Sequence, residues 1–306
     1  MDWEFFIQQI ITGISIGGIY ALLAVGYALI YSVFDFSNFA FGCIMMVSAF
    51  TCYYCNNIWL VGQSMFSSPV GALIVNIAIA VVAGIIISVL IELAAYRPMR
   101  RMGSGRLFLM ITGMGINLAV VNAATVKLGA NARAISLGSF NMQSFNFSGI
   151  HISKLDIFAL LIALGTLAIL YVFLHRTKVG LGIRASAYST SIAGLMGVNV
   201  NRISLTIFVI SGITAGIAGV FCGMKYAVNP TVGSAPALKA FIASVIGGLG
   251  SLQGAVVGGI VLGIVETYVS GFISSVYRDL FSYGILIFVL FFMPSGLLGK
   301  HMQDKI

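Results

Sequence analysis

The sequence predicts an all-α integral membrane protein, organised as a single domain over residues 1–306. Hydrophobic residues make up 59% of the chain and charged residues only 8%, whereas a soluble domain carries about 25% charged residues. Apolar runs long enough to cross a bilayer recur from one end of the chain to the other. The 36 glycines are typical of membrane helices, in which small residues let helix backbones approach closely.

The apolar runs predict about 8–9 transmembrane segments, because two of them are too short for a certain crossing and could be re-entrant. The short ones are the polar-interrupted second segment and the glycine-ended seventh segment. In chain order, the nine segments cover residues 10–33, 36–55, 70–95, 107–128, 157–174, 203–226, 237–249, 255–273 and 280–293.

The positive charges predict how the chain is oriented. They lie at the ends of apolar segments and not in a basic stripe interleaved with aromatic residues, so the net charge of +8 does not indicate nucleic-acid binding. The positive-inside rule places three basic clusters in the cytoplasm, which fits nine crossings of a bacterial plasma (inner) membrane with the amino terminus outside and the carboxyl terminus inside. The clusters are Arg97, Arg100, Arg101 and Arg106; Arg176, Lys178, Arg184 and Arg202; and Lys300 and Lys305.

Two parts of the chain look like copies of each other. Each has a glycine-rich apolar segment, a polar break, a short helix and a long span with a glutamate near its end. The intervening span at 157–174 would make the copies face opposite ways, and inverted repeats with interrupted helices are typical of transporters, whose breaks mark the substrate path. The paired features are the glycines within 13–18 and 212–219, the breaks at 35–38 and 229–231, and Glu92 and Glu266.

Polar side chains within the apolar segments are candidate site residues. Asn38 follows the first break, where its amide can bind an amino-acid ligand or simply cap a helix. Asn117 lies inside an apolar span, where hydrogen bonding between helices competes with substrate contact. Glu92 and Glu266 lie near predicted helix ends, so we expect them to snorkel to the membrane surface or to pair with Arg97 or Arg278, and not to form a proton relay.

The segment 178–202 is mildly hydrophobic and cytoplasmic by the charge argument. Ala187, Ile192, Leu195 and Met196 can share one face of a helix there. Such a helix could dock into a groove of a partner protein or lie at the membrane surface as an anchor.

Neither a metal site nor a nucleotide site is predicted. Cys52 and Cys55 form a C-x-x-C pair without a second pair to complete a zinc site, and we interpret them as small residues near a helix end. The glycine-rich stretch 247–251 follows no predicted strand, and the chain has no G-x-x-x-x-G-K-[ST] motif. We therefore expect no cofactor in this chain.

Several stretches resemble a known family. Ser191 to Gly197 resembles the E-A-A-x-x-x-G motif by which permeases of ATP-binding-cassette (ABC) importers engage their ATPases, although Ser191 replaces the usual glutamate. The first break reads N-F-A-F-G-C where N-F-A-H-G-E is usual, so both ionisable groups are gone. The chain as a whole is similar to the permeases for branched-chain (hydrophobic) amino acids. The matching stretches are 17–22, 38–42, 92–100, 239–241, 247–255 and 293–299.

The resemblance implies a permease that works by alternating access with several partners: a second, related permease, two cytoplasmic ATPases that hold ATP and Mg²⁺, and a periplasmic or extracellular substrate-binding protein. Membrane lipid would surround the complex. We expect the substrate path to include Tyr20, Asn38, Phe39, Phe41, Gly42 and Asn117. We expect the ATPase contact to include Ala187, Ser191, Ile192, Ala193, Leu195, Met196 and Gly197.

Other functions remain open at this stage. An ion-coupled secondary transporter for a small neutral solute would need intramembrane carboxylates or an ion site, and an ABC permease could instead carry urea or short amides. An enzyme is not expected, because the three histidines lie in predicted loops or segment ends and form no cluster with a nucleophile. ATP hydrolysis is expected in a separate subunit.

Overall fold

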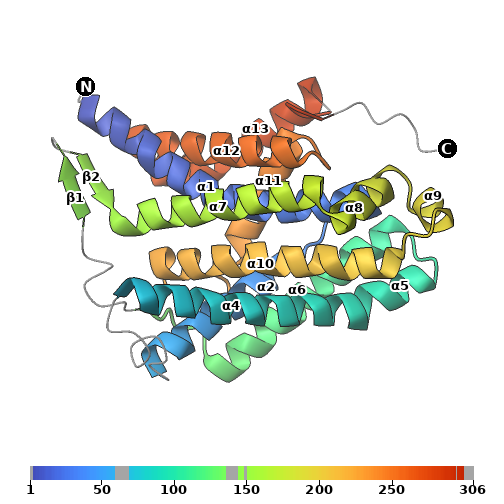
Figure 1. Cartoon of the computed structure of the whole chain (residues 1–306). Coiled ribbons are helices and arrows are strands. Elements are labelled where there is room, and N and C mark those ends of the chain that lie inside the picture. Colours follow the sequence, from blue (N-terminus) through green and yellow to red (C-terminus); the bar gives the residue numbers. More distant parts are fainter. Residues whose placement is uncertain (1–2, 59–68, 136–143, 148–149, 294, 300–306) are drawn as a thin grey trace.

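The computed structural model describes residues 3–58, 69–135, 144–147, 150–293 and 295–299, and it confirms the all-α membrane fold. Helices of very different length form a bundle, and a small antiparallel hairpin of β1 (Ser144–Phe147) and β2 (Ile150–Ser153) lies at one end, near the amino terminus (Figure 1).

The first half of the bundle contains α1 (Trp3–Phe34), α2 (Phe41–Tyr53), α4 (Pro69–Ile91), α5 (Arg97–Arg101), α6 (Arg106–Leu128) and α7 (Lys154–Arg176). A π-helical turn η1 (Tyr54–Ile58) extends α2, and another, η2 (Glu92–Tyr96), joins α4 to α5. The second half contains α8 (Lys178–Tyr188), α9 (Thr190–Leu195), α10 (Val200–Tyr226), α11 (Ser234–Gly247), α12 (Leu252–Phe272), the 3₁₀ turn η4 (Ser275–Tyr277) and α13 (Arg278–Phe292).

Seven of the described helices are long and apolar enough to cross a membrane. They are α1, α4 with its extension through α5, α6, α7, α10, α12, and α13 with η4. The two segments predicted to be short are the helices α2, of 13 residues, and α11, of 14 residues. The predicted 8–9 segments are therefore seven spans and two interrupted helices.

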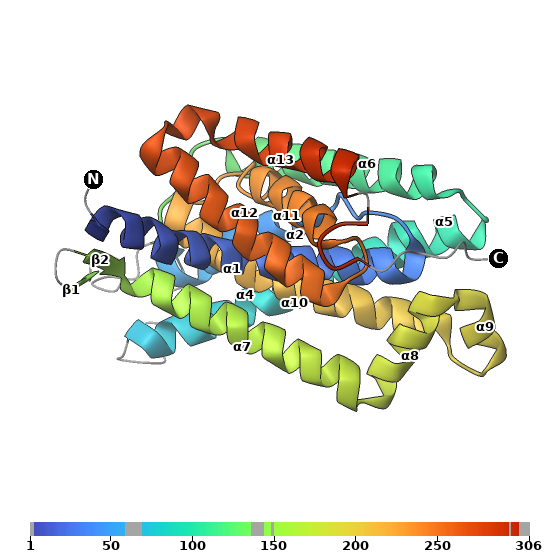
Figure 2. The same ribbon diagram turned by 90° about the horizontal axis from the view of Figure 1, so that it is seen from above.

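The predicted inverted repeat is visible in the direction of the helices. Along the bundle, α1 and α4 run one way, whereas α10 and α12 run the other way (Figures 1 and 2). The partners are exchanged between the copies, since α1 packs mainly on α12 and α10 packs mainly on α4. Helices α1 and α10 are buried along most of their length and form the centre of the bundle.

Glycines allow both of these helix pairs to pack backbone against backbone. A Cβ atom on Gly259 of α12 would lie 2.5 Å from the backbone nitrogen of Ala21 on α1. In the other pair, a Cβ atom on Gly212 of α10 would lie 2.8 Å from the carbonyl oxygen of Gly84 on α4. Real Cβ atoms do not come this close, so these helix pairs depend on glycine, as membrane helix pairs often do.

The two copies also break their first helix in the same way. Asp35 directly follows α1 with φ of 54°, and Ala227 directly follows α10 with φ of 63°. They are the only two described non-glycine residues with positive φ. Left-handed backbone costs an L-residue roughly 1–2 kcal/mol, so the surrounding structure must hold each break in place.

Two of the three predicted basic clusters lie at the same end of the bundle. Helix α5, the start of α6, the end of α7, α8 and the start of α10 gather opposite the amino terminus (Figure 1). The third cluster, Lys300 and Lys305, falls outside the described residues. We call this end of the molecule the basic end.

Gly259→Ala is expected to destabilise the protein by about 1–3 kcal/mol, because the added methyl group forces α1 and α12 apart. Gly115 is the matched control, since it also lies in a helix but a Cβ atom there would meet nothing within 4 Å. Gly115→Ala is expected to be neutral or to stabilise by up to about 1 kcal/mol. Thermal unfolding of the purified proteins in detergent compares them, and equal midpoints would contradict the packing argument.

Candidate functional site

The two interrupted helices begin at the same place inside the bundle. Gly42, in the first turn of α2, contacts Gly233, the residue that precedes α11, through its backbone. Neither helix has a side-chain cap at this end. Amide groups of the first turns and the positive ends of two helix dipoles therefore converge there, which favours a negatively charged group of a ligand.

A groove of about 330 Å³ lies beside this junction. Its walls come from the start of α2, the middle of α6 and the start of α11. Most of the lining is apolar, and Asn117 and Ser234 add short polar side chains. The lining residues are Tyr27, Phe39, Gly42, Met114, Asn117, Leu118, Ser234, Ala237 and Leu238.

Two asparagines near the junction have buried atoms with no hydrogen-bond partner among the described residues. The Oδ1 atom of Asn38 accepts hydrogen bonds from the backbone of Ala40 (2.9 Å) and from the hydroxyl of Tyr96 (2.6 Å), but its Nδ2 atom has none. The Oδ1 atom of Asn117 is likewise unpaired, and it lies 3.0 Å from the position of a Cβ atom on Gly42. Leaving such a group unpaired costs about 1–3 kcal/mol, so both asparagines are candidates for ligand contact.

The other residues predicted for the substrate path occupy different positions. Phe39 lines the groove and its ring lies 5.5 Å from that of Phe241. Phe41 is fully buried behind the groove wall, where it stacks on Tyr27 at 4.5 Å. Tyr20 does not line the groove, and its hydroxyl donates a hydrogen bond of 2.8 Å to Glu266.

Glu266 is the centre of a buried charged cluster on α11, α12 and α13. The Nζ atom of Lys239 lies 2.5 Å from Glu266 and 2.9 Å from Asp279. Ser282 donates a further hydrogen bond of 3.0 Å to Glu266, whereas the Nε atom of Arg278 is 4.0 Å away. The predicted pairing of Glu266 with Arg278 is therefore confirmed, and Lys239 is a second, closer cation that the sequence did not indicate.

Glu92 is buried in the corresponding place of the first copy, near the basic end. It forms an ion pair with Arg100, and the hydroxyl of Ser204 donates a hydrogen bond of 2.6 Å to it. The prediction that Arg97 pairs with Glu92 is wrong. In a regular α-helix, the residue about seven positions after Glu92 would lie two turns above it on the same face. The π turn η2 adds one residue, so Arg100, eight positions after Glu92, lies there instead.

The segment 178–202 lies at the basic end as two helices and not as one. Ser189, with φ of −159°, separates α8 from α9. The shared face that we predicted is therefore wrong for Ala187, which packs against the core from α8. Ile192, Leu195 and Met196 project from α9 into the surroundings, with 87% of Leu195 and 81% of Met196 exposed, while Ala193 is buried.

Gly197 ends α9 and has a structural reason to be glycine. Its φ is 87°, a conformation that L side chains rarely adopt. The backbone of Gly197 donates to Gly194 at 3.1 Å, and that of Val198 donates to Ala193 at 3.0 Å, which closes the helix with a Schellman-type cap. Ser191 is exposed beside the apolar residues of α9.

A family model for the permease component of branched-chain amino acid transport systems matches residues 9–290. The chain is 32% identical over 305 residues to BraD of Pseudomonas aeruginosa, a high-affinity branched-chain amino acid transport system permease protein, with 98% of each chain covered. It is 35% identical over 313 residues to the permease protein LivH of Escherichia coli K12, with 99% of this chain and 98% of LivH covered.

The chain belongs to the branched-chain amino acid transport permease family. The resemblance stated from its motifs is confirmed over nearly the whole length, and the permease is a multi-pass membrane protein. A more distant relative, the probable branched-chain amino acid transport permease protein LivH of Methanocaldococcus jannaschii, is 27% identical over 294 residues and covers 91% of this chain and 88% of its own.

Sequence reasoning missed several residues of the permease that the fold brings to these sites. Tyr27, Met114, Leu118 and Leu238 line the groove but carry no signal that separates them from other apolar residues of their helices. Ser234 could have been found, because it follows the second break just as Asn38 follows the end of α1.

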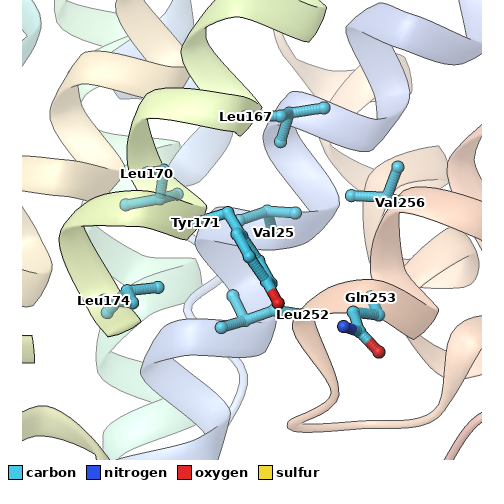
Figure 3. A pocket seen from close by; sticks show the side chains of 8 residues that line it. All are labelled: Val25, Leu167, Leu170, Tyr171, Leu174, Leu252, Gln253 and Val256. Atoms are coloured by element: carbon cyan, nitrogen blue, oxygen red, sulfur yellow. The ribbon is translucent and has the colours of Figure 1, made fainter. Parts of the chain in front are cut away.

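A crevice between α1, α7 and α12 is a poor candidate for a solute site. Figure 3 shows Tyr171 lying across it, with its hydroxyl toward the end lined by Leu252 and Gln253. The crevice holds only about 60 Å³, and most of its lining is aliphatic. Its size and chemistry suit packing, not recognition of a polar molecule.

Lys239→Met is expected to destabilise the permease by about 3–5 kcal/mol, because it leaves the buried carboxylate of Glu266 without its closest cation. Adding Glu266→Gln should restore much of the loss, since the uncompensated charge is then gone. Arg106→Gln breaks the exposed pair with Asp35 and should cost at most about 1 kcal/mol. The thermal unfolding midpoints of the purified variants in detergent measure these differences. A Lys239→Met midpoint equal to that of the wild type would refute the view that Lys239 compensates the buried charge of Glu266.

Proposed function

We propose that the permease is the membrane-spanning subunit of an ABC importer that carries branched-chain or other hydrophobic amino acids into the cytoplasm. The observation that supports this most directly is the groove at the junction of α2 and α11. It combines apolar walls with converging helix N-termini and the unpaired Oδ1 atom of Asn117. The names of BraD and LivH as branched-chain amino acid permeases agree with it.

Each part of a hydrophobic amino acid has a counterpart in the groove. The carboxylate suits the N-terminal ends of α2 and α11, because interrupted helices in transporters direct these ends at anionic groups of the solute. The Asn117 side chain can exchange hydrogen bonds with the ammonium or the carboxylate group. Tyr27, Met114, Leu118 and Leu238 provide an apolar surface for the aliphatic side chain.

A second, homologous permease would complete this site. Helices α6 and α13 lie along one side of the bundle, and α11 lies next to α13 nearer its centre (Figure 2). Met114 and Leu118 in the groove wall are at least half exposed, so the groove opens on this side. A second subunit placed against α6 and α13 would enclose the solute on a shared path between the two subunits.

The energy would come from two ATPase subunits, each with ATP and Mg²⁺, bound at the basic end. The positive-inside rule supports a cytoplasmic location for this end and an external location for the amino terminus, where the substrate-binding protein would dock. The exposed apolar face of α9 is of a size that could dock into a groove of an ATPase subunit. Closure of the ATPases would move α8 and α9 and switch the bundle between outward-open and inward-open states.

Two alternatives make different predictions. An ion-coupled transporter would use a membrane carboxylate for its ion, but Glu92 and Glu266 are each held by a cation. Urea or short amides would not need the apolar walls of the groove. Uptake of radiolabelled leucine by vesicles that contain the assembled complex separates these functions. Dependence on the ion gradient instead of ATP, or inhibition by urea but not by valine, would overturn the proposal.

Asn117→Leu is expected to lower leucine uptake at least about tenfold, the effect of one lost hydrogen bond to a charged group. Stability should fall little, because the native Oδ1 atom of Asn117 is already unpaired. Asn122→Leu is the control on the same helix, since Asn122 is exposed and bonds only the backbone of Leu118. Equal uptake by the two variants would remove Asn117 from the path.

Leu195→Glu is expected to lower ATP-driven uptake about tenfold or more, because a charge replaces an apolar contact to the ATPase. This test is cleaner than a substitution of Gly197, whose backbone conformation disfavours any side chain. Val276→Glu is the control for ATPase binding, since Val276 is comparably exposed at the opposite end of the bundle. Co-purification of the ATPase with each variant is the second measurement, and unchanged binding to Leu195→Glu would refute the docking role.

A further inference from the structure

A second pocket lies beside the first turns of α11, near the end of the bundle that holds the amino terminus. Its volume is about 180 Å³, roughly that of six water molecules. Residues on α1, the end of α10, the second break, α11 and the start of α13 surround it. Its polar lining consists of Tyr20, Tyr226, Asn229, Thr231, Lys239 and Arg278.

Lys239 of this lining is not available to a ligand. It is 6% exposed and lies between the carboxylates of Glu266 and Asp279. Glu266 in turn accepts hydrogen bonds from Tyr20 and Ser282. These five side chains satisfy one another, so they form a closed wall of the pocket.

Arg278 differs from Lys239 in that its terminal nitrogens remain as hydrogen-bond donors at the pocket, although Glu266 and the neighbouring Asp279 partly balance its charge. Its side chain is about one-third exposed, and its one recorded ion pair joins the Nε atom to Glu266 at 4.0 Å, the outer limit for such a contact. Its two terminal nitrogens make no recorded hydrogen bond within the described part of the chain. A guanidinium group in a membrane protein with free donors of this kind suggests a functional site.

Neighbouring groups add hydrogen-bond donors on the same pocket. The Oδ1 atom of Asn229 accepts from the backbone (3.0 Å) and hydroxyl (3.1 Å) of Thr231, which leaves the Nδ2 atom of Asn229 as a donor. Tyr226 contributes a hydroxyl at the end of α10. A guanidinium fork with further donors matches a carboxylate, which accepts two parallel hydrogen bonds from arginine.

We propose that this pocket binds the carboxylate of an amino acid at the outer entrance of the transport path, with Arg278 as the principal contact. The inference rests on the proposed function. The pocket and the groove share α11, since Ala235, Pro236 and Lys239 line the pocket while Ser234, Ala237 and Leu238 line the groove. A solute released at Arg278 therefore has only to pass the first turns of α11 to reach the second site. The carboxylate of Glu266, 4.0 Å from the Nε atom of Arg278, offsets part of the attraction between Arg278 and the solute, which permits release.

Cysteine protection tests this site without transport. Thr231→Cys places an exposed thiol in the pocket, and the four native cysteines are buried, so a methanethiosulfonate reagent should label mainly the new thiol of the purified full-length chain. We expect millimolar leucine to slow labelling severalfold, whereas leucinamide, which lacks the carboxylate, should not. Adding Arg278→Gln should abolish protection, and Arg278→Lys should retain part of it. Equal protection by leucine and leucinamide, or none by either, would overturn the proposal.

Leucine uptake by the assembled transporter gives the second test. Arg278→Gln should lower uptake about tenfold, the effect of a lost charge-assisted pair, and Tyr226→Phe should lower it about fivefold. Lys127→Gln is the control, because it removes an exposed charge at the same end. Unchanged uptake by Arg278→Gln would overturn the proposal, as would loss of binding-protein association, which would assign Arg278 to docking. Absence of ATP-driven uptake by the unaltered chain would instead refute the proposed function.

Discussion

The backbone contact between Gly42 and Gly233 is the constraint on which the rest of the structure depends. It holds the starts of α2 and α11 together inside the bundle, where both helices are interrupted. A side chain at Gly233 would separate these ends, and the groove beside them would lose its shape. Non-helical backbone at this depth is tolerated in a membrane protein only where protein or a polar cavity surrounds it. The groove therefore depends on the junction for its shape, and the non-helical backbone at the junction depends on the protein and the groove that surround it.

The exchanged packing of the two copies explains how such a junction can be rigid and still belong to a moving protein. Helix α1 is bound to α12 and α10 to α4 through glycine contacts that leave no gap between the backbones. The most extensive helix contacts thus join one copy to the other, while α2 packs on α4 and α11 on α12 within each copy. The proposed alternating access would use this exchange, because a rotation of one half of the bundle would be transmitted to both breaks at once.

The buried charges follow the same two-copy arrangement of the bundle. The two glutamates inside the spans occupy corresponding places in the copies, and each is neutralised locally, by Arg100 in one case and by Lys239 in the other. An unpaired carboxylate at these depths would be costly, at about 2.5–3.5 kcal/mol on insertion scales for a residue such as Asp. The cluster around Glu266 is balanced as a whole, because Lys239 and Arg278 face the carboxylates of Glu266 and Asp279.

The sequence by itself determined the membrane class, the long spans, both helix breaks and the inverted repeat, because these depend on local composition and chain order. The family resemblance, from motifs spread along the chain, rests on the same kind of signal. The sequence also predicted Asn38, Phe39, Gly42 and Asn117 for the substrate path, and the structure places these residues at or beside the junction of α2 and α11. Only the tertiary structure decided which polar groups meet. Tyr20 and Glu266 are 246 positions apart, and Lys239 reaches Glu266 from another helix. Helices that are apolar on all sides carry no periodic signal for the face they bury, so packing alone selects their partners.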